Sequence, residues 1–266
     1  HLSTFGGDHM DIDISLADQY FIGEDTGDNV GVSVAGAGDI DGDGLDDILI
    51  GAYQYFGSNN SMGKTYLFYG SNLTYEDTNI GTADHIFMGQ DGDFSGGSVA
   101  GGGDIDGDGL DDILIGASLA LQDEVQVGKV YLLLGSSVIH HDTLVELTQA
   151  DVRIIGEEIS GLLGWAVSYA GDIDGDSLDD IMVSAPGISD NSGKIYLVVS
   201  SQLTSSEFNI SSAYRSFIGE DGFTGESITS IDDIDGDGVH EFLIGAPWHT
   251  GAGERSGEAY LIMSGP

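Results

Sequence analysis

The stretch GDIDGDGLDDILIGA occupies Gly38–Ala52 and returns without a change at Gly103–Ala117. Two diverged copies follow, so the aspartate motif begins four times, at Asp39, Asp104, Asp172 and Asp233. Self-similarity at a fixed period of about 60 residues indicates a repeat architecture, which has to be settled before any local structure is assigned.

Three further runs recur in phase with the aspartates. QYFIGED (Gln19–Asp25) and GVSVAGAGD (Gly31–Asp39) precede the first motif, and GKTYLFYG (Gly63–Gly70) follows it. These runs are short, rich in Val, Ile, Tyr and Phe, and separated by Gly, Asp, Asn and Ser, which is typical of strands and turns. No segment has the apolar spacing of a helix, so we expect almost none. Four-stranded units in tandem predict an all-β fold, a β-propeller.

The two ends of the chain fall within a repeat unit. The chain opens with an extra strand at Gln19–Gly23, and its last unit is one strand short. Pairing the two would close a ring and cover exposed sheet edges. We therefore predict one domain over residues 11–266, a four-bladed propeller closed by its N-terminal strand, with 1–10 a vector-derived leader because His9–Met10 resembles a cloning junction. The alternatives are a piece of a longer array and a dimer that forms an eight-bladed ring.

Each aspartate loop has the pattern of a calcium loop. Asp39, Asp41 and Asp43 stand at positions 1, 3 and 5, and Asp47 stands at position 9. Carboxylates at these offsets, with a backbone carbonyl at position 7, wrap a hard cation, and magnesium is disfavoured because it prefers small octahedral shells that retain water. Turn formation explains one or two aspartates, but four crowded carboxylates repel one another without a counter-ion.

The sequence therefore predicts four structural calcium sites, in the loops 39–47, 104–112, 172–180 and 233–241. An EF-hand is excluded, because its position 12 ligand would fall on apolar residues such as Ile50 and because strand-like runs flank the loop. The predicted ligands are Asp39, Asp41, Asp43, Leu45 and Asp47; Asp104, Asp106, Asp108, Leu110 and Asp112; Asp172, Asp174, Asp176, Leu178 and Asp180; and Asp233, Asp235, Asp237, Val239 and Glu241.

The order of these motifs resembles a known repeat. F-x-G, then G-x-S-V-A, D-x-D-x-D-G-x-x-D, I-L-I-G-A and G-K-x-Y-L resemble the FG-GAP repeat of the integrin α-subunit β-propeller and its prokaryotic relatives, from Gln19 to Ser264. Integrin propellers have seven blades, whereas this chain has four units. The resemblance implies that the calcium loops join strands 1 and 2 on one face. It also implies that ligand-binding loops, which join strands 4 to 1 and 2 to 3, lie on the other face.

Composition narrows the classes of partner. Against 46 acidic residues stand only 6 basic ones, for a formal net charge of −40. Phosphate binding needs clustered Lys and Arg, so nucleic acid and anionic membrane surfaces are excluded as partners. The acidic excess indicates bound cations, a salty environment, or both. Cysteine is absent, which excludes a disulfide framework, and no apolar run is long enough to insert into a membrane.

Candidate ligand residues come from the two loops that carry aromatic side chains. They are Tyr53, Tyr55 and Phe56 in the first unit and Trp248, His249 and Arg255 in the last. Aromatics beside scattered polar groups suit recognition of a protein or a glycan, whereas Trp165, inside a strand-like run, is expected in the core.

We find no catalytic arrangement in the sequence. The histidines are scattered, and none stands in a metalloprotease or nucleophile-elbow pattern. The favoured interpretation is a calcium-stabilised extracellular or cell-surface adhesion module, monomeric and part of a larger surface protein, which binds a protein or glycan on another cell or in the matrix. The alternative is an accessory or catalytic propeller of a secreted enzyme that acts on polysaccharides or lipids.

Overall fold

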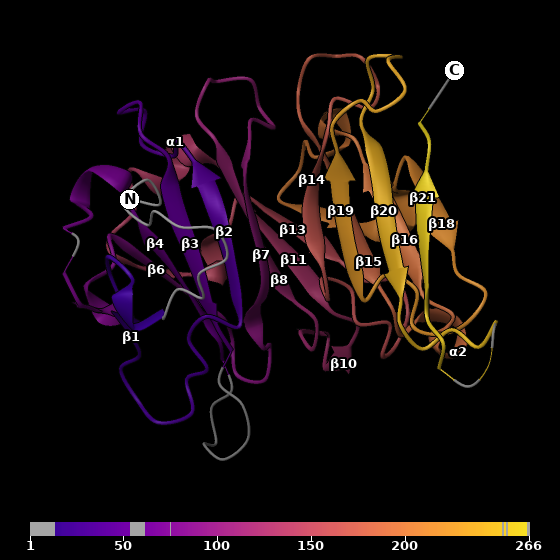
Figure 1. Ribbon diagram of the computed structural model, residues 1–266, viewed down its shortest axis with the longest axis horizontal. Helices are drawn as coiled ribbons and strands as arrows, with labels where there is room; N and C mark the ends of the chain where they lie inside the picture. The colour runs from indigo at the N-terminus through magenta and orange to yellow at the C-terminus, as the bar shows by residue number, and fades with distance from the viewer. Residues whose placement is uncertain (1–13, 54–61, 75, 252, 254, 265–266) are drawn as a thin grey trace, which may run out of the picture.

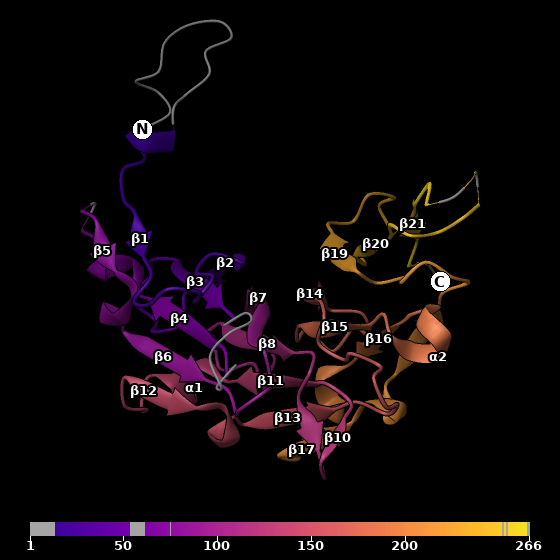
Figure 2. The ribbon, with the colours of Figure 1, turned by 90° about the horizontal axis from the view of Figure 1, so that it is seen from below.

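The structure is a computed structural model that describes residues 14–53, 62–74, 76–251, 253 and 255–264. Four sheets, each built on an antiparallel blade, stand side by side and fan around a common axis (Figure 1; Figure 2). Each sheet contains one aspartate motif, so the predicted all-β fold of propeller blades is confirmed. Within these residues, no helix is both long and apolar enough to cross a membrane.

The blades follow one another along the chain. Blade 1 contains β2 (Ser33–Gly38), β3 (Asp47–Ala52), β4 (Lys64–Phe68) and β6 (His85–Met88). Blade 2 contains β7 (Ser95–Gly103), β8 (Asp112–Ala117), β11 (Lys129–Leu133) and β13 (Val152–Ile155). Blade 3 contains β14 (Val167–Gly171), β15 (Asp180–Ala185), β16 (Lys194–Val198) and β18 (Arg215–Ile218). Blade 4 contains β19 (Ser227–Ile231), β20 (Glu241–Ala246) and β21 (Glu258–Ile262).

Short strands link each blade to the one before it. β12 (Leu144–Glu146) pairs in parallel with β6 of blade 1, and β17 (Glu207–Asn209) pairs in parallel with β13 of blade 2. The N-terminal strand β1 (Phe21–Ile22) pairs in the same way with β5 (Thr78–Asn79). β1 therefore holds the place of the outer strand of a blade that would precede blade 1.

The remaining elements are small. β9 (Leu121–Gln122) and β10 (Val125–Gln126) form a hairpin between β8 and β11. The helices α1 (Gly135–Val138) and α2 (Ile188–Asn191) are single turns, as expected from a sequence without helical periodicity. Single 3₁₀ turns cover Ile14–Leu16, Gly70–Asn72, Ile80–Thr82, Leu147–Gln149, Ser200–Gln202 and Ile210–Ser212.

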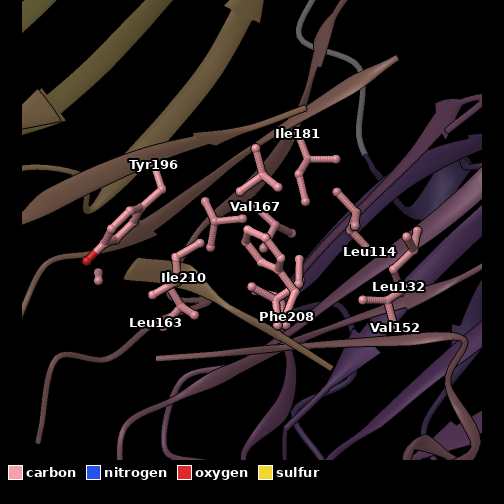
Figure 3. Packing of buried hydrophobic residues seen from close by; sticks show 14 of the residues in the cluster. Leu114, Leu132, Val152, Leu163, Val167, Ile181, Tyr196, Phe208 and Ile210 are labelled. Carbon is pink, nitrogen blue, oxygen red and sulfur yellow. The ribbon is translucent and has the colours of Figure 1, made fainter. Parts of the chain in front are cut away.

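The core lies between the blades. Because side chains alternate along a strand, each sheet presents one apolar row to the preceding blade and another to the following blade. Figure 3 shows one such interface, where Leu114 and Leu132 of blade 2 lie in one cluster with Ile181 and Tyr196 of blade 3, and Leu114 lies near Ile181. Corresponding clusters join blade 1 to blade 2 and blade 3 to blade 4. Because each interface buries apolar side chains of two adjacent blades, much of the folding stability comes from contacts between neighbouring blades.

The predicted closure of the ring by the N-terminal strand is wrong. β1 pairs with β5, and among the described residues β21 has β20 as its only strand partner. Leu243 and Leu261 of blade 4 are 38% and 48% exposed, whereas Leu114 and Leu132, at the same positions in blade 2, are 0% and 1% exposed. The blades therefore form an open arc (Figure 2).

Candidate metal sites

Each aspartate loop joins the first and second strands of its blade. The loop at 39–47 connects β2 to β3, and the other three loops occupy the same place in their blades. All four therefore lie at one end of the strands, which we call the aspartate face. The loops between blades, and those between second and third strands, lie at the other end, which we call the opposite face.

Backbone amides shape each loop around its carboxylates. Asp39 Oδ1 accepts a hydrogen bond from Gly42 N at 2.8 Å, and Asp39 Oδ2 accepts one from Gly44 N at 2.9 Å. Asp43 Oδ1 accepts from Leu45 N at 2.9 Å. Gly42 and Gly44 have φ values of 78° and 88°, which glycine adopts without strain. In the other three loops, the carboxylates at positions 1 and 5 accept hydrogen bonds from the backbone amides at the equivalent positions.

The third loop departs from this glycine pattern. Ser177 stands where the other loops have glycine, and its φ of 71° lies in the left-handed region that side chains rarely adopt. Its amide still donates to Asp172 Oδ2 at 2.8 Å. The serine therefore keeps the loop geometry at a cost in backbone strain.

Carboxylates from each loop lie close enough together to hold a cation. One oxygen from each member of a group lies within 4.8 Å of the others, and the groups are Asp39, Asp41 and Asp43; Asp104, Asp106 and Asp108; Asp172, Asp174 and Asp180; and Asp233, Asp235, Asp237 and Glu241. Three or four converging carboxylates are a donor set for a hard divalent cation.

The structure thus brings together most of the predicted carboxylate ligands, with three exceptions. Asp47, Asp112 and Asp176 lie outside these groups. Asp176 Oδ2 instead accepts from Ser200 Oγ at 3.1 Å. The carbonyl ligands predicted at position 7, on Leu45, Leu110, Leu178 and Val239, stay a prediction.

The position 9 carboxylate has a second role that sequence reasoning missed. Asp112 is fully buried, and it accepts from Ile105 N at 2.8 Å and from Gly135 N at 2.9 Å. Asp47 and Asp180 make the equivalent pairs of bonds, and Glu241 accepts from Ile234 N. This carboxylate joins the loop to the chain after the third strand, so it is a structural residue whether or not a metal is bound.

Burial changes the acidity of these groups. It raises the pKa of Asp112 to about 7 and the pKa values of Asp47 and Asp180 to about 6, although backbone hydrogen bonds act in the opposite direction. At the exposed position 1 of the fourth loop, amide donors from Gly238 and Gly236 lower the pKa of Asp233. The buried carboxylates therefore resist ionisation in the metal-free protein, while a bound cation would favour it.

We expect the stability of the metal-free protein to fall as the pH rises from about 4 to about 7. An acid whose pKa is higher in the folded chain contributes stability below its unfolded pKa of about 3.9, and that contribution disappears as the pH rises through the folded pKa. Thermal melts in chelator at a series of pH values measure this, and calcium should remove the fall. If stability above pH 5.5 falls as much in Asp112→Asn as in the unchanged chain, the Asp112 carboxylate is not a source of this pH dependence.

Neighbouring loops are joined to one another. Asp111, at position 8 of the second loop, accepts from Asp39 N at 2.7 Å, and its own amide donates to Asp39 O at 3.2 Å. Asp179 of the third loop makes the equivalent pair of hydrogen bonds with Asp104 of the second loop. Asp104 N donates to Asp179 Oδ2 at 3.0 Å, and Asp179 N donates to Asp104 O at 3.0 Å. Position 8 of the fourth loop is His240. The first three candidate sites are therefore linked in series across the aspartate face.

On the opposite face, the four blades share a hollow of about 600 Å³. Residues at the start of the first strand of every blade line it, together with the side chains of Tyr53, Phe94 and Trp165. The Tyr53 and Phe94 rings lie 6.0 Å apart between centroids. Trp165 is 40% exposed, so the expectation that it belongs to the core is wrong. It precedes β14 and lines the hollow.

The structure separates the predicted ligand residues of the last unit. Trp248 is exposed, its Nε1 donates to Glu226 Oε2 at 3.0 Å, and the Arg255 guanidinium lies 4.7 Å from its ring centroid. His249 is buried, with ring nitrogens 3.1 Å from Asp221 Oδ1 and 3.2 Å from Glu258 Oε1, so it holds blade 4 together rather than facing a ligand. Tyr55 and Phe56 lie outside the described residues.

Comparison with known proteins agrees with the repeated blades. A family model described as the FG-GAP repeat matches residues 30–68, 95–133, 163–198 and 224–262. Integrin alpha pat-2 of Caenorhabditis elegans is 31% identical over 248 residues, 90% of this chain and 19% of that protein. Integrin alpha-4 of Xenopus laevis is 28% identical over 212 residues (75% and 18%), and integrin alpha-IIb of Homo sapiens is 30% identical over 158 residues (54% and 14%). The chain spans less than a fifth of the length of these relatives.

Proposed function

The chain belongs to the FG-GAP repeat family, and we propose that it is a calcium-stabilised recognition module that acts in adhesion. It binds a protein or glycan on another cell or in the matrix through the opposite face, and it works outside the cell or at the cell surface as part of a larger protein. The similarity to integrin alpha chains, of which it matches less than a fifth, supports this assignment.

Calcium is the cation we propose for the aspartate face. The donor sets consist of carboxylates on loops that are partly exposed, and calcium accepts such flexible, oxygen-rich shells more readily than magnesium does. A cation there offsets the repulsion between carboxylates that lie within 4.8 Å of one another. Metal binding to the folded loops then contributes directly to folding stability.

The shared hollow on the opposite face is the observation that carries the proposal of ligand binding. The exposed Trp165 and the partly buried Tyr53 and Phe94, from different blades, line it together with serine residues and Glu226. A concave site lined by aromatic rings with a few convergent polar groups is a common arrangement for ligand binding. The loops around it also differ from blade to blade, unlike the aspartate loops.

We expect Trp165→Ala to weaken ligand binding at least tenfold, because a central aromatic side chain contributes more than about 2 kcal/mol at many interfaces. A glycan array and a protein pull-down, each run with and without calcium, identify the ligand. Binding of that ligand by the variant is then compared with binding by the unchanged chain. Tyr214→Ala, which removes an exposed aromatic outside the hollow, is the matched control. Equal binding by Trp165→Ala and the unchanged chain would exclude the hollow as the ligand site.

A further inference from the structure

Two interfaces between successive units carry the same partly exposed ionic contact. The Glu24 carboxylate, in the loop after β1, lies 2.9 Å from Lys64 Nζ and accepts from Tyr66 OH at 3.1 Å. Glu157, in the loop after β13, lies 2.7 Å from Lys194 Nζ and accepts from Tyr196 OH at 2.6 Å. In both places, a glutamate that follows the outer strand of one unit neutralises the lysine of the next G-K-x-Y-L strand.

The equivalent contact in blade 2 has lost its carboxylate. Gln90 stands where Glu24 and Glu157 stand in the other loops. Lys129 is only 8% exposed, yet no carboxylate oxygen of a described residue lies within 4.0 Å of its Nζ. The partner tyrosine, Tyr131, turns instead to Asp93, with its OH 3.0 Å from Asp93 Oδ2. A buried ammonium without a close counter-ion is costly, so this position favours an added negative group.

A second cation lies in the same small pocket. Lys129 and Arg153 both line a cavity of about 140 Å³, together with Gln90, Gln122, Thr148 and the acidic Glu207. Only 6 basic residues occur in the whole chain, so two in one pocket is a marked concentration. Arg153 Nε is buried and has no hydrogen-bond partner among the described residues. The pocket therefore offers one unpaired ammonium and one unpaired guanidinium donor.

Two carboxylates stand near these cations and leave them incompletely paired. Glu207, which lines the pocket, is largely exposed, and its Oε1 lies 3.0 Å from Arg153 Nη2 but leaves Arg153 Nε without a partner. Asp93 is buried and does not line the pocket. Burial raises the pKa of Asp93, while its hydrogen bonds with Gln90 N and Tyr131 and the charge of Lys129 act in the opposite direction.

We propose that this pocket binds a carboxylate group supplied by a ligand, in the place that Glu24 and Glu157 occupy at the other interfaces. The incoming carboxylate pairs with Lys129 Nζ and accepts from Arg153, as expected for charge-assisted hydrogen bonds. The small volume admits a carboxylate on a short stem, which a free small acid or an acidic side chain of a protein provides. The pocket lies at the opposite-face end of β11, and the proposal does not depend on calcium.

Titration with acetate, and with acetamide as the uncharged control, tests the proposal at constant ionic strength. Amide chemical shifts of the full chain report binding. We expect saturable acetate binding to the unchanged chain, no response to acetamide, and binding at least tenfold weaker in Lys129→Met. Lys194→Met, which removes a lysine that is already paired, should bind acetate as the unchanged chain does. Absence of acetate binding to the unchanged chain, or equal binding by Lys129→Met, would overturn the proposal.

Gln90→Glu provides a test that does not require removing a buried charge. The new carboxylate should pair with Lys129, raise the Tm by about 2–4 °C, and abolish acetate binding. An unchanged acetate affinity in this variant would also contradict the proposal. Short capped peptides with one glutamate or one glutamine distinguish the two sources. Tighter binding of the glutamate peptide than of acetate identifies an acidic side chain, and equal or weaker binding identifies a free small acid.

Discussion

Removal of calcium is expected to lower the melting temperature of the protein by at least about 10 °C. A site held at a hundredfold excess of calcium over its Kd contributes about 2.7 kcal/mol to folding stability. For a domain of this size, each kcal/mol shifts the Tm by about 2–4 °C, so even two of the four proposed sites produce this change. Without the cation, the carboxylates of each loop also repel one another over less than 4.8 Å.

Differential scanning calorimetry with calcium, and with excess chelator, measures this effect. Adding magnesium to the chelated protein is the control, and we expect it to restore little of the lost stability because the loops suit a larger and more flexible shell. Identical melts with calcium and with chelator would exclude a structural role for calcium in these loops.

Asp112→Ala is the single substitution with the largest expected effect. It removes a fully buried carboxylate and leaves the amides of Ile105 and Gly135 without acceptors. Each unsatisfied buried amide costs about 1–3 kcal/mol, so we expect a total loss of about 2–6 kcal/mol, whether calcium is present or absent. Urea unfolding in both conditions measures it. If the variant does not fold, Asp112→Asn, which keeps one acceptor oxygen, replaces it.

Asp108→Ala is the matched control for this substitution. Asp108 belongs to the same loop, but it is exposed and its Oδ1 accepts only from Leu110 N. Its loss should reduce stability when calcium is present and leave the chelated protein almost unchanged. Equal losses for Asp108→Ala and Asp112→Ala in chelator would show that the position 9 carboxylate has no role beyond the metal.

Features that repeat with the blade were predictable from the sequence. The strands flanking Gly38–Ala52 and Gly103–Ala117, and the convergence of Asp39, Asp41 and Asp43, follow from local spacing and from recurrence at one period. Each blade meets the same neighbours in the same way. Each repeat of a pattern in the sequence therefore supports the structure predicted for the other units, and the predicted strands and carboxylate groups agree with the structure.

Features that depend on how blades meet were not predictable. The rotation between blades, set by contacts such as those of Leu114 with the next sheet, leaves β1 away from β21 and the ring open. The exposure of Trp165, which lines the hollow that the four blades share, is likewise a feature of the assembled blades. The role of Asp112 depends on an amide distant in sequence, that of Gly135. The replacement of glutamate by Gln90 was visible in the sequence, but its meaning required the paired lysines of the neighbouring blades.

The number of calcium ions bound to the folded chain is the most direct measurement of the central claim. Native mass spectrometry after gel filtration in calcium should show four ions per chain, one for each of the loops 39–47, 104–112, 172–180 and 233–241. Asp108→Ala should remove one ion and leave three. A folded chain that carries no calcium, or that keeps the same number of ions in Asp108→Ala, would contradict the assignment of the aspartate loops as calcium sites.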